Sequence, residues 1–165
     1  MSADPARVRV LILDVDGVLT DGRLYYGPRG EALKVFHVRD GAGLKQLAAA
    51  GVTLAVISGR RSAMTRQRCR ELGIRHVLQG VDDKAAALAR LCARLRVEPA
   101  ECACVGDDTP DVALMRLVGL SFAVADAHEA ARAAADTVTR LPGGLGAVRE
   151  VCDQLLAARQ GGPPA

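Results

Sequence analysis

Short apolar runs alternate along the chain with alanine-rich stretches in which apolar residues recur at helical spacing. The apolar runs predict β-strands at residues 8–15, 52–57, 76–78, 102–105 and 120–124. The stretches between them predict helices at 40–50, 62–72, 84–96 and 110–117, the first two of which are expected to stop at Gly51 and Gly73. Because strands and helices alternate with short connections, the pattern predicts an α/β fold, a doubly wound parallel sheet with helices on both faces.

One segment departs from this alternation. Residues 23–38 hold two extended, partly alternating stretches around the turn Gly27-Pro28-Arg29-Gly30, which predicts a β-hairpin inserted after the first strand. The hairpin is too small to be a domain, and a chain of 165 residues is long enough for one domain. We therefore expect a single domain over residues 1–160 and a disordered tail, rich in glycine and proline, at 161–165.

Composition narrows the class of protein. Although 50% of the residues are hydrophobic, no apolar run approaches the roughly 20 residues of a membrane-spanning helix and no signal-peptide pattern precedes the first strand, so we expect a cytoplasmic protein without membrane contact. The cysteines include only one close pair, Cys102 and Cys104, which indicates buried free thiols and no zinc site. A net charge of +3 and 2% aromatic residues argue against nucleic acid as a partner and are compatible with a small anionic ligand.

The basic residues are strongly biased towards arginine. Only Lys34, Lys45 and Lys84 are lysines among the 22 basic residues. In such a chain, a retained lysine favours a position that needs a compact point charge. The bias does not separate the three.

Polar and charged residues follow four of the predicted strands directly. Asp14 and Asp16 leave the first strand, and Gly17 allows a tight turn behind them. The other strand ends carry Ser58-Gly59-Arg60, Asp82-Asp83-Lys84 and Asp107-Asp108 with Asp111. Because the carboxyl ends of parallel strands share one edge of the sheet, these groups are expected to meet in one crevice. Clustered carboxylates repel one another, and aspartate oxygens suit Mg²⁺, so we expect Mg²⁺ among them.

Phosphoryl transfer is the chemistry that uses this set of groups. Alternate residues leaving a strand point the same way, so Asp14 and Asp16 can face one substrate. One aspartate can attack phosphorus, and the second can protonate the leaving oxygen and later activate water. Mg²⁺ and Lys84 can neutralise the charge of the transferred group.

These motifs carry a resemblance to a known family. The segments DVDGVLTD, ISGR, the lysine of DDK and GDDTPD resemble, in that order, the motifs of the haloacid dehalogenase superfamily of phosphohydrolases. More narrowly, DVDGVLTDG, FHVRDGAGLK, ISGR, RCRELGI, QGVDDK, GDDTPD and LPGGLGAVREVCD follow the order of the 3-deoxy-D-manno-octulosonate 8-phosphate phosphatases over about residues 8–155. The resemblance implies a Rossmann-like sheet without a large cap domain, a phosphorylated sugar acid as substrate and a place in the biosynthesis of that sugar and of lipopolysaccharide.

The resemblance also assigns roles to individual residues. It makes Asp14 the nucleophile and Asp16 the acid and base, and it places Mg²⁺ on Asp14, Asp107 and the carbonyl of Asp16. It assigns the phosphoryl oxygens to Ser58 and Lys84, and the support of the metal site to Asp108 and Asp111. Apart from the resemblance, a guanidinium at the crevice suits the carboxylate of a sugar acid, so Gly59, Arg60 and Arg39 are candidate substrate-binding residues.

The resemblance bears on assembly as well. It implies a homotetramer, built in part by the hairpin, in which the C-terminal segment reaches a neighbour's active site. Leu145 stands where relatives often carry an arginine, which puts a substrate contact there in doubt.

Plainer interpretations stand beside these. Ser58 is compatible with a loop hydroxyl, Arg39 and Arg60 with ordinary surface positions, and the acids of GDDTPD with a solvated turn. The glycines of the segment 143–146 are compatible with a flexible link before the last helix, and the three histidines with structural roles.

Other functions also remain open. A related nine-carbon keto-sugar acid phosphate is an alternative substrate, and a non-catalytic Mg²⁺-binding module is disfavoured by the intact Asp14 and Asp16. A phospho-receiver domain is disfavoured because Lys84 precedes the GDDTPD cluster.

Overall fold

A parallel sheet forms the centre of the molecule. The computed structural model describes residues 4–161, and it contains a six-stranded sheet in the order β5-β4-β1-β6-β7-β8 with every neighbouring pair parallel. The strands are β1 (Val10–Leu13), β4 (Thr53–Ser58), β5 (His76–Gln79), β6 (Cys102–Gly106), β7 (Leu120–Ala123) and β8 (Thr137–Val138). All four residues of β1 are buried, since the strand is paired on both sides and covered on both faces.

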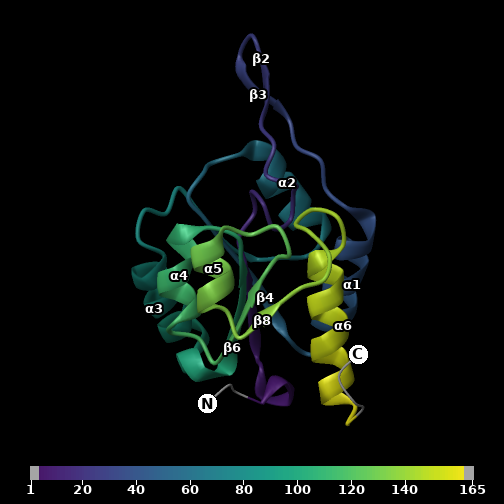
Figure 1. Ribbon diagram of the computed structural model, residues 1–165, viewed down its shortest axis with the longest axis vertical. Coiled ribbons are helices and arrows are strands. Elements are labelled where there is room, and N and C mark those ends of the chain that lie inside the picture. The colour runs from purple at the N-terminus through teal and green to yellow at the C-terminus, as the bar shows by residue number, and fades with distance from the viewer. Residues whose placement is uncertain (1–3, 162–165) are drawn as a thin grey trace.

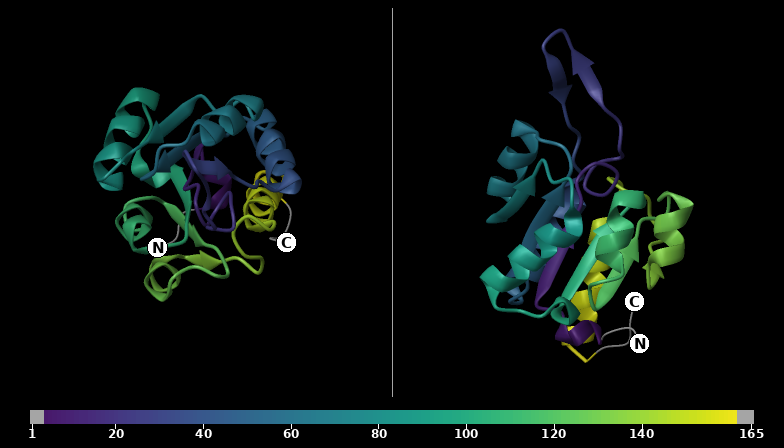
Figure 2. Two further views of the ribbon diagram at one scale, coloured as in Figure 1. Left: turned by 90° about the horizontal axis from the view of Figure 1, so that it is seen from above. Right: turned by 90° about the vertical axis from the view of Figure 1, so that its left-hand side faces the viewer.

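Helices cover both faces of this sheet, as predicted (Figures 1 and 2). Helices α1 (Val38–Ala49), α2 (Ala63–Glu71) and α6 (Ala147–Arg159) lie on one face, where α1 packs against α6. Helices α3 (Lys84–Leu95), α4 (Thr109–Met115) and α5 (Glu129–Ala134) lie on the other. Glycines in the left-handed region follow α1 and α2 at Gly51 and Gly73, which confirms the predicted stops.

The predicted hairpin is present after the first strand. It consists of β2 (Tyr25–Gly27) and β3 (Gly30–Leu33), which pair antiparallel and project from the body as a separate two-stranded sheet (Figures 1 and 2). Because it extends past the helices, it leaves several apolar side chains in contact with solvent.

Two elements and several boundaries differ from the sequence prediction. Helix α5 has six residues and β8 has two, lengths too short for a periodic pattern to reveal. Short 3₁₀ turns occur at Pro5–Arg7 and Pro99–Glu101. Helix α1 begins two residues before the predicted start, because the Nδ1 atom of His37 accepts a hydrogen bond from the backbone N–H of Arg39 and caps the helix.

The predicted burial of the thiols is confirmed. All five cysteines are free and buried. Within residues 4–161, no helix combines the length and the apolarity that crossing a membrane requires. Of the tail predicted at 161–165, residues 162–165 lie outside the described part of the chain.

Candidate active site

A cleft of about 290 Å³ opens at the carboxyl edge of the sheet, where the loops after β1, β4, β5 and β6 meet. It brings together nine of the ten residues that the sequence pointed to: Asp14, Asp16, Ser58, Gly59, Arg60, Lys84, Asp107, Asp108 and Asp111. The rule that the strand ends of a parallel sheet share one edge therefore places these groups correctly.

Lys84 links two of the carboxylates. It is the first residue of α3, is 6% exposed, and places its Nζ atom 3.1 Å from Oδ1 of Asp14 and 2.5 Å from Oδ1 of Asp111. Burial acts to lower the pKa of Lys84, but the charges of Asp14 and Asp111 outweigh it and raise that pKa above its ordinary value. A permanently charged ammonium at the base of the cleft is suited to holding a phosphoryl group next to Asp14.

Asp111 organises the loop after β6. Its Oδ2 atom accepts hydrogen bonds from the backbone N–H groups of Asp107, at 3.0 Å, and Asp108, at 3.3 Å. Asp108 in turn caps α4, since its Oδ1 atom accepts a hydrogen bond from the Thr109 N–H at 2.7 Å. Both oxygens of Asp111 are thus engaged, which fits a supporting role better than a direct metal contact.

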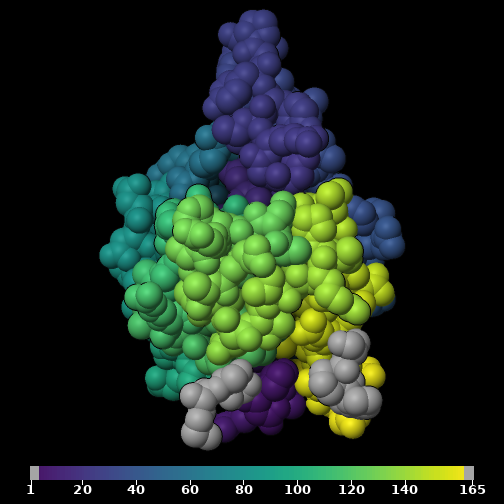
Figure 3. Space-filling model, viewed as in Figure 1, coloured from purple at the N-terminus to yellow at the C-terminus, as the bar shows by residue number. Residues whose placement is uncertain are grey.

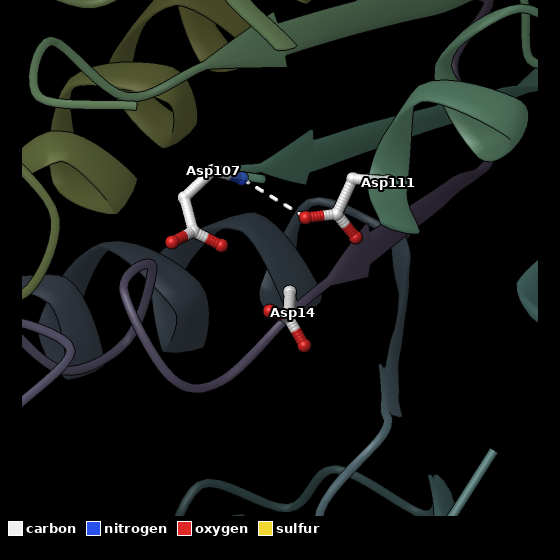
Figure 4. A group of neighbouring side chains, drawn as sticks. All are labelled: Asp14, Asp107 and Asp111. Carbon is white, nitrogen blue, oxygen red and sulfur yellow. Dashed lines mark hydrogen bonds between the residues drawn. The ribbon is translucent and has the colours of Figure 1, made fainter. Parts of the chain in front are cut away.

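The carboxylates of Asp14, Asp107 and Asp111 form the centre of the cleft (Figure 4), and their nearest oxygens lie within 4.8 Å of one another. Burial raises the pKa of Asp14 to about 6 against the opposing charge of Lys84. Burial and the charges of Asp14, Asp111 and Asp108 raise the pKa of Asp107 to about 8. A divalent cation would stabilise the charged form of these buried carboxylates, and carboxylate oxygens are the ligands that Mg²⁺ prefers. The residues therefore fit Mg²⁺.

Gly17 gives the Asp107 carboxylate its room. Gly17 has a φ of +91°, and a Cβ atom there would lie 2.0 Å from Oδ2 of Asp107. The predicted tight turn is therefore confirmed, and the turn also lets the loop after β1 pass close to the loop after β6.

Asp16 lies in a network of charges that the sequence did not predict. The Lys34 ammonium, carried on the segment after β3, donates a hydrogen bond to Oδ1 of Asp16 and lies 2.9 Å from Oε1 of Glu31. Arg60 lies on the other side, with its Nε atom 3.5 Å from Oδ2 of Asp16. The scarcity of lysine was the one signal for Lys34, and it did not distinguish Lys34 from the exposed Lys45.

The two remaining predicted residues differ in placement. Ser58, at the end of β4, is buried and lines the cleft. The structure does not bring Arg39 to the cleft: it lines a separate cavity of about 420 Å³ beside α6, together with Leu145 and Arg149. The neighbouring Asp40 explains this position, because its buried carboxylate accepts a hydrogen bond from the Arg149 N–H at 2.9 Å and ties the start of α1 to α6.

The glycine-rich segment before α6 is packed and does not act as a flexible link. The Gly143 N–H donates to Oδ1 of Asp126 at 2.9 Å, and the Gly144 N–H donates to the carbonyl of Val18 at 2.9 Å. A Cβ atom on Gly143 would lie 1.7 Å from the carbonyl oxygen of Gly17. This segment therefore supports the loop that carries Asp16.

Replacing Gly143 by alanine is expected to push this loop out of place. Overpacking against backbone should cost roughly 1–3 kcal/mol of stability, and a displacement near 1 Å should lower kcat by about 10²-fold. Thermal unfolding and steady-state phosphate release would measure both effects. Gly73→Ala is the control for activity: its φ of +73° makes alanine strained and lowers stability there too, but a Cβ atom meets nothing within 4 Å, so kcat should stay unchanged. Full activity of Gly143→Ala would contradict the supporting role.

Comparison with known proteins adds independent findings. Residues 76–143 match the family model described as haloacid dehalogenase-like hydrolase. The chain is 49% identical over 157 residues to the 3-deoxy-D-manno-octulosonate 8-phosphate phosphatase of Escherichia coli K12, an alignment that covers 95% of this chain and 84% of that protein.

Solved structures agree with this match. The phosphatase of that name from Moraxella catarrhalis, in complex with magnesium, phosphate and KDO, gives a TM-score of 0.93 at 43% identity and covers 95% of this chain and 90% of that one. The phosphatase of the same name from Yersinia pestis gives a TM-score of 0.93 at 48% identity, with 95% and 85% covered.

Proposed function

The chain belongs to the 3-deoxy-D-manno-octulosonate 8-phosphate phosphatases, a family of haloacid dehalogenase-like hydrolases, and on this basis we propose that it releases phosphate from that sugar acid phosphate with Mg²⁺ as cofactor. The observation that carries the proposal is the meeting of Asp14, Asp16, Lys84 and Asp107 in one cleft. This set contains a nucleophile, an acid and base, a fixed cation and a metal-binding carboxylate.

The first step transfers the phosphoryl group to the protein. A carboxylate oxygen of Asp14 attacks phosphorus, the bond from phosphorus to the sugar oxygen breaks, and its electron pair goes to that oxygen. Asp16 donates a proton to the leaving oxygen. Lys84, 3.1 Å from Asp14, is placed to neutralise the charge of the transferred group.

The second step returns Asp14 to its starting state. Asp16, now a carboxylate, takes a proton from water as that water attacks the phosphorus of the aspartyl-phosphate. The bond between phosphorus and Asp14 breaks, and inorganic phosphate leaves. The Ser58 hydroxyl, which lines the cleft beside Asp14, is placed to donate to a phosphoryl oxygen in both steps.

Mg²⁺ would be held by the oxygen atoms in the cleft that are not already engaged in supporting the loops. Asp14 and Asp107 would supply carboxylate oxygens, and Asp16 would supply its backbone carbonyl, as the family resemblance implies. Asp111 accepts a hydrogen bond from the backbone N–H of Asp107 and so supports that loop. Mg²⁺ bound there supplies charge neutralisation for the phosphoryl oxygens and orients the group for in-line attack.

Selectivity is expected to come from the part of the substrate away from phosphorus. Arg60 lies at the rim of the cleft with 42% of its side chain exposed, and it can reach a ligand that extends outward. A guanidinium-to-carboxylate contact is worth roughly 1.5–3 kcal/mol. Such remote binding raises turnover when it orients the reacting phosphate. Leu145 is 55% exposed beside the separate cavity and offers no charge for a second contact of this kind.

The test is phosphate release from a panel of sugar phosphates. With Mg²⁺ present, we expect kcat/KM for 3-deoxy-D-manno-octulosonate 8-phosphate to exceed that for glucose 6-phosphate by about 10–100-fold, the factor that corresponds to one guanidinium contact. A chelator serves as the negative control. Comparable kcat/KM values for the two substrates would indicate a phosphatase without selectivity for sugar acids. A higher kcat/KM for a nine-carbon keto-sugar acid phosphate would make that compound the preferred substrate. No release from any of them would favour a non-catalytic module.

We further propose that the protein is a homo-oligomer, most simply a tetramer, joined in part by the hairpin. The hairpin stands clear of the body (Figure 3), and Tyr26 is 65% exposed, with Leu24, Leu33 and Val35 also exposed. An isolated two-stranded hairpin is marginal in water, and exposed apolar side chains on it favour a partner surface.

Light scattering at micromolar concentration is expected to give a mass near four times 17.3 kDa. Replacing Tyr26 and Val35 by serine should shift that mass downward, because the change removes apolar contact area from the hairpin. Ala157→Ser on α6, away from the hairpin, is the control. A wild-type protein that scatters as a monomer would rule out the assembly.

A further inference from the structure

We propose that Lys34 is a positioning residue that holds the Asp16 carboxylate in the orientation for proton transfer, so that the hairpin segment takes part in catalysis. The inference rests on the proposed function, since it assigns a role to a residue that stands behind the proposed acid and base. It is carried by the contacts of Lys34 and by its position outside the cleft.

Lys34 contacts Asp16 without lining the cleft. Its side chain is 2% exposed, its ammonium donates a hydrogen bond to Oδ1 of Asp16, and it is absent from the lining of the catalytic cleft, which Asp16 does line. Lys34 can therefore influence the reaction through Asp16 and not by contact with the transferred phosphoryl group.

Lys34 is itself fixed by a second layer of contacts. Oε1 of Glu31 lies 2.9 Å from the Lys34 Nζ atom, an ion-pair distance without hydrogen-bond geometry. The other oxygen of Glu31 accepts a hydrogen bond from the Ser62 hydroxyl at 2.5 Å, and the Ser62 N–H donates to Oε1 of Gln79 at 2.6 Å. The chain of contacts runs from the hairpin through Lys34 to Asp16 and is anchored at the start of α2.

The two oxygens of Asp16 are not equivalent in this network. Oδ1 is engaged by the buried Lys34, whereas the one ion-pair contact of Oδ2 within residues 4–161 is the longer one, of 3.5 Å, to Arg60, whose side chain is 42% exposed. The geometry leaves Oδ2 as the oxygen that can exchange a proton with the leaving group and then with water. An acid or base must lie within hydrogen-bond reach of its proton partner, so a carboxylate free to rotate would be a poorer catalyst.

Stability alone is a weak explanation for the buried ammonium. Moving two charged groups out of water costs free energy. In many proteins the attraction between the two charges only offsets this cost, so a buried ion pair adds little net stability. The network holds two acids, Asp16 and Glu31, and two bases, Lys34 and Arg60, so it is balanced in charge at the mouth of the cleft.

The test separates positioning of the acid from general damage by using two leaving groups. A sugar alkoxide needs a proton to leave, whereas 4-nitrophenolate is weakly basic and leaves without one. With enzyme in excess, single-turnover release of each product reports the first transfer only. For Lys34→Met we expect the rate with the sugar phosphate to fall about 10–10²-fold, while nitrophenolate release changes by less than about threefold. KM for the sugar phosphate should stay within about threefold, because Lys34 does not line the cleft.

Three further variants complete the design. Lys34→Arg keeps a cation beside Asp16 and should recover most of the lost rate, whereas Lys45→Met, on the exposed surface of α1, should match the wild type. Glu31→Gln is isosteric and loosens Lys34 without removing it, so it should show the same selective loss to a smaller degree. If Lys34→Met fails to fold, judged by its melting temperature, Glu31→Gln carries the test.

Two results would overturn the proposal. An equal loss with both leaving groups would indicate general damage to the site, and unchanged rates with both would remove any role for Lys34. The sugar arm can use any sugar phosphate that the wild type hydrolyses. A wrong choice of physiological substrate would therefore appear in the wild-type panel and would leave this comparison intact.

Discussion

Replacing Asp14 by asparagine is expected to lower turnover by 10⁴-fold or more, roughly the loss seen when a nucleophile is removed from an enzyme. An amide oxygen cannot serve as the attacking carboxylate, and no neighbouring acid can substitute. Asp107 is the carboxylate proposed to hold Mg²⁺, and Asp111 is engaged by Lys84 and two backbone N–H groups. Steady-state phosphate release in Mg²⁺ buffer measures the effect.

The variant should remain folded. The amide has the shape of the carboxylate, and it removes one charge from a cluster in which Asp14, Asp107 and Asp111 repel one another. We therefore expect the melting temperature to stay within a few degrees of the wild type. Asp153→Asn is the matched control, because the same change there affects only an ion pair with Arg149 on the surface of α6. Near wild-type turnover by a folded Asp14→Asn protein would show that another group attacks phosphorus.

Replacing Asp16 by asparagine is expected to slow turnover by about 10²–10⁴-fold, the usual value of a positioned acid or base. The backbone carbonyl of Asp16 is unchanged by the substitution, so Mg²⁺ binding should persist. KM should change little, because the lost interaction belongs to the transition state. A decline in kcat of less than threefold, in a protein that still binds Mg²⁺, would assign the proton transfers to another residue.

The sequence was sufficient for the residues that follow the strands. Asp14, Ser58, Lys84 and Asp107 lie where predicted because each is within a few positions of the end of a parallel strand, and topology then brings those ends together. Nothing beyond local pattern and one rule of sheet architecture was needed for this part of the site.

The contributions of distant segments could not be read in the same way. Lys34 contacts Asp16, and Glu31 contacts Lys34, because the chain that leaves the projecting hairpin returns to the loop after β1, and hairpin periodicity does not encode that direction. Gly143 is more than a hundred residues from Gly17 in the sequence. The glycine-rich composition of the segment 143–146 suggested flexibility, whereas the fold requires that segment to pack closely against the loop after β1.

Arg39 shows the opposite failure. Arg39 is adjacent to motif residues in the sequence, yet it lies beside α6 and not in the cleft. The next residue, Asp40, accepts a hydrogen bond from the backbone N–H of Arg149 and so fixes the start of α1 against α6. Proximity along the chain was a poor guide there because a helix turns successive side chains to different sides.

The central claim is that Asp14 carries the phosphoryl group during the reaction, and the Asp16→Asn variant offers the most direct measurement. With 4-nitrophenyl phosphate the first transfer needs no proton, whereas hydrolysis of the aspartyl-phosphate lacks its base, so the phosphorylated protein should accumulate. We predict a burst of one equivalent of nitrophenolate per chain and, after acid quenching, a mass increase of one phosphoryl group on the peptide that contains Asp14. Continued release of nitrophenolate from an unmodified protein, or a phosphoryl group on any other residue, would contradict the account.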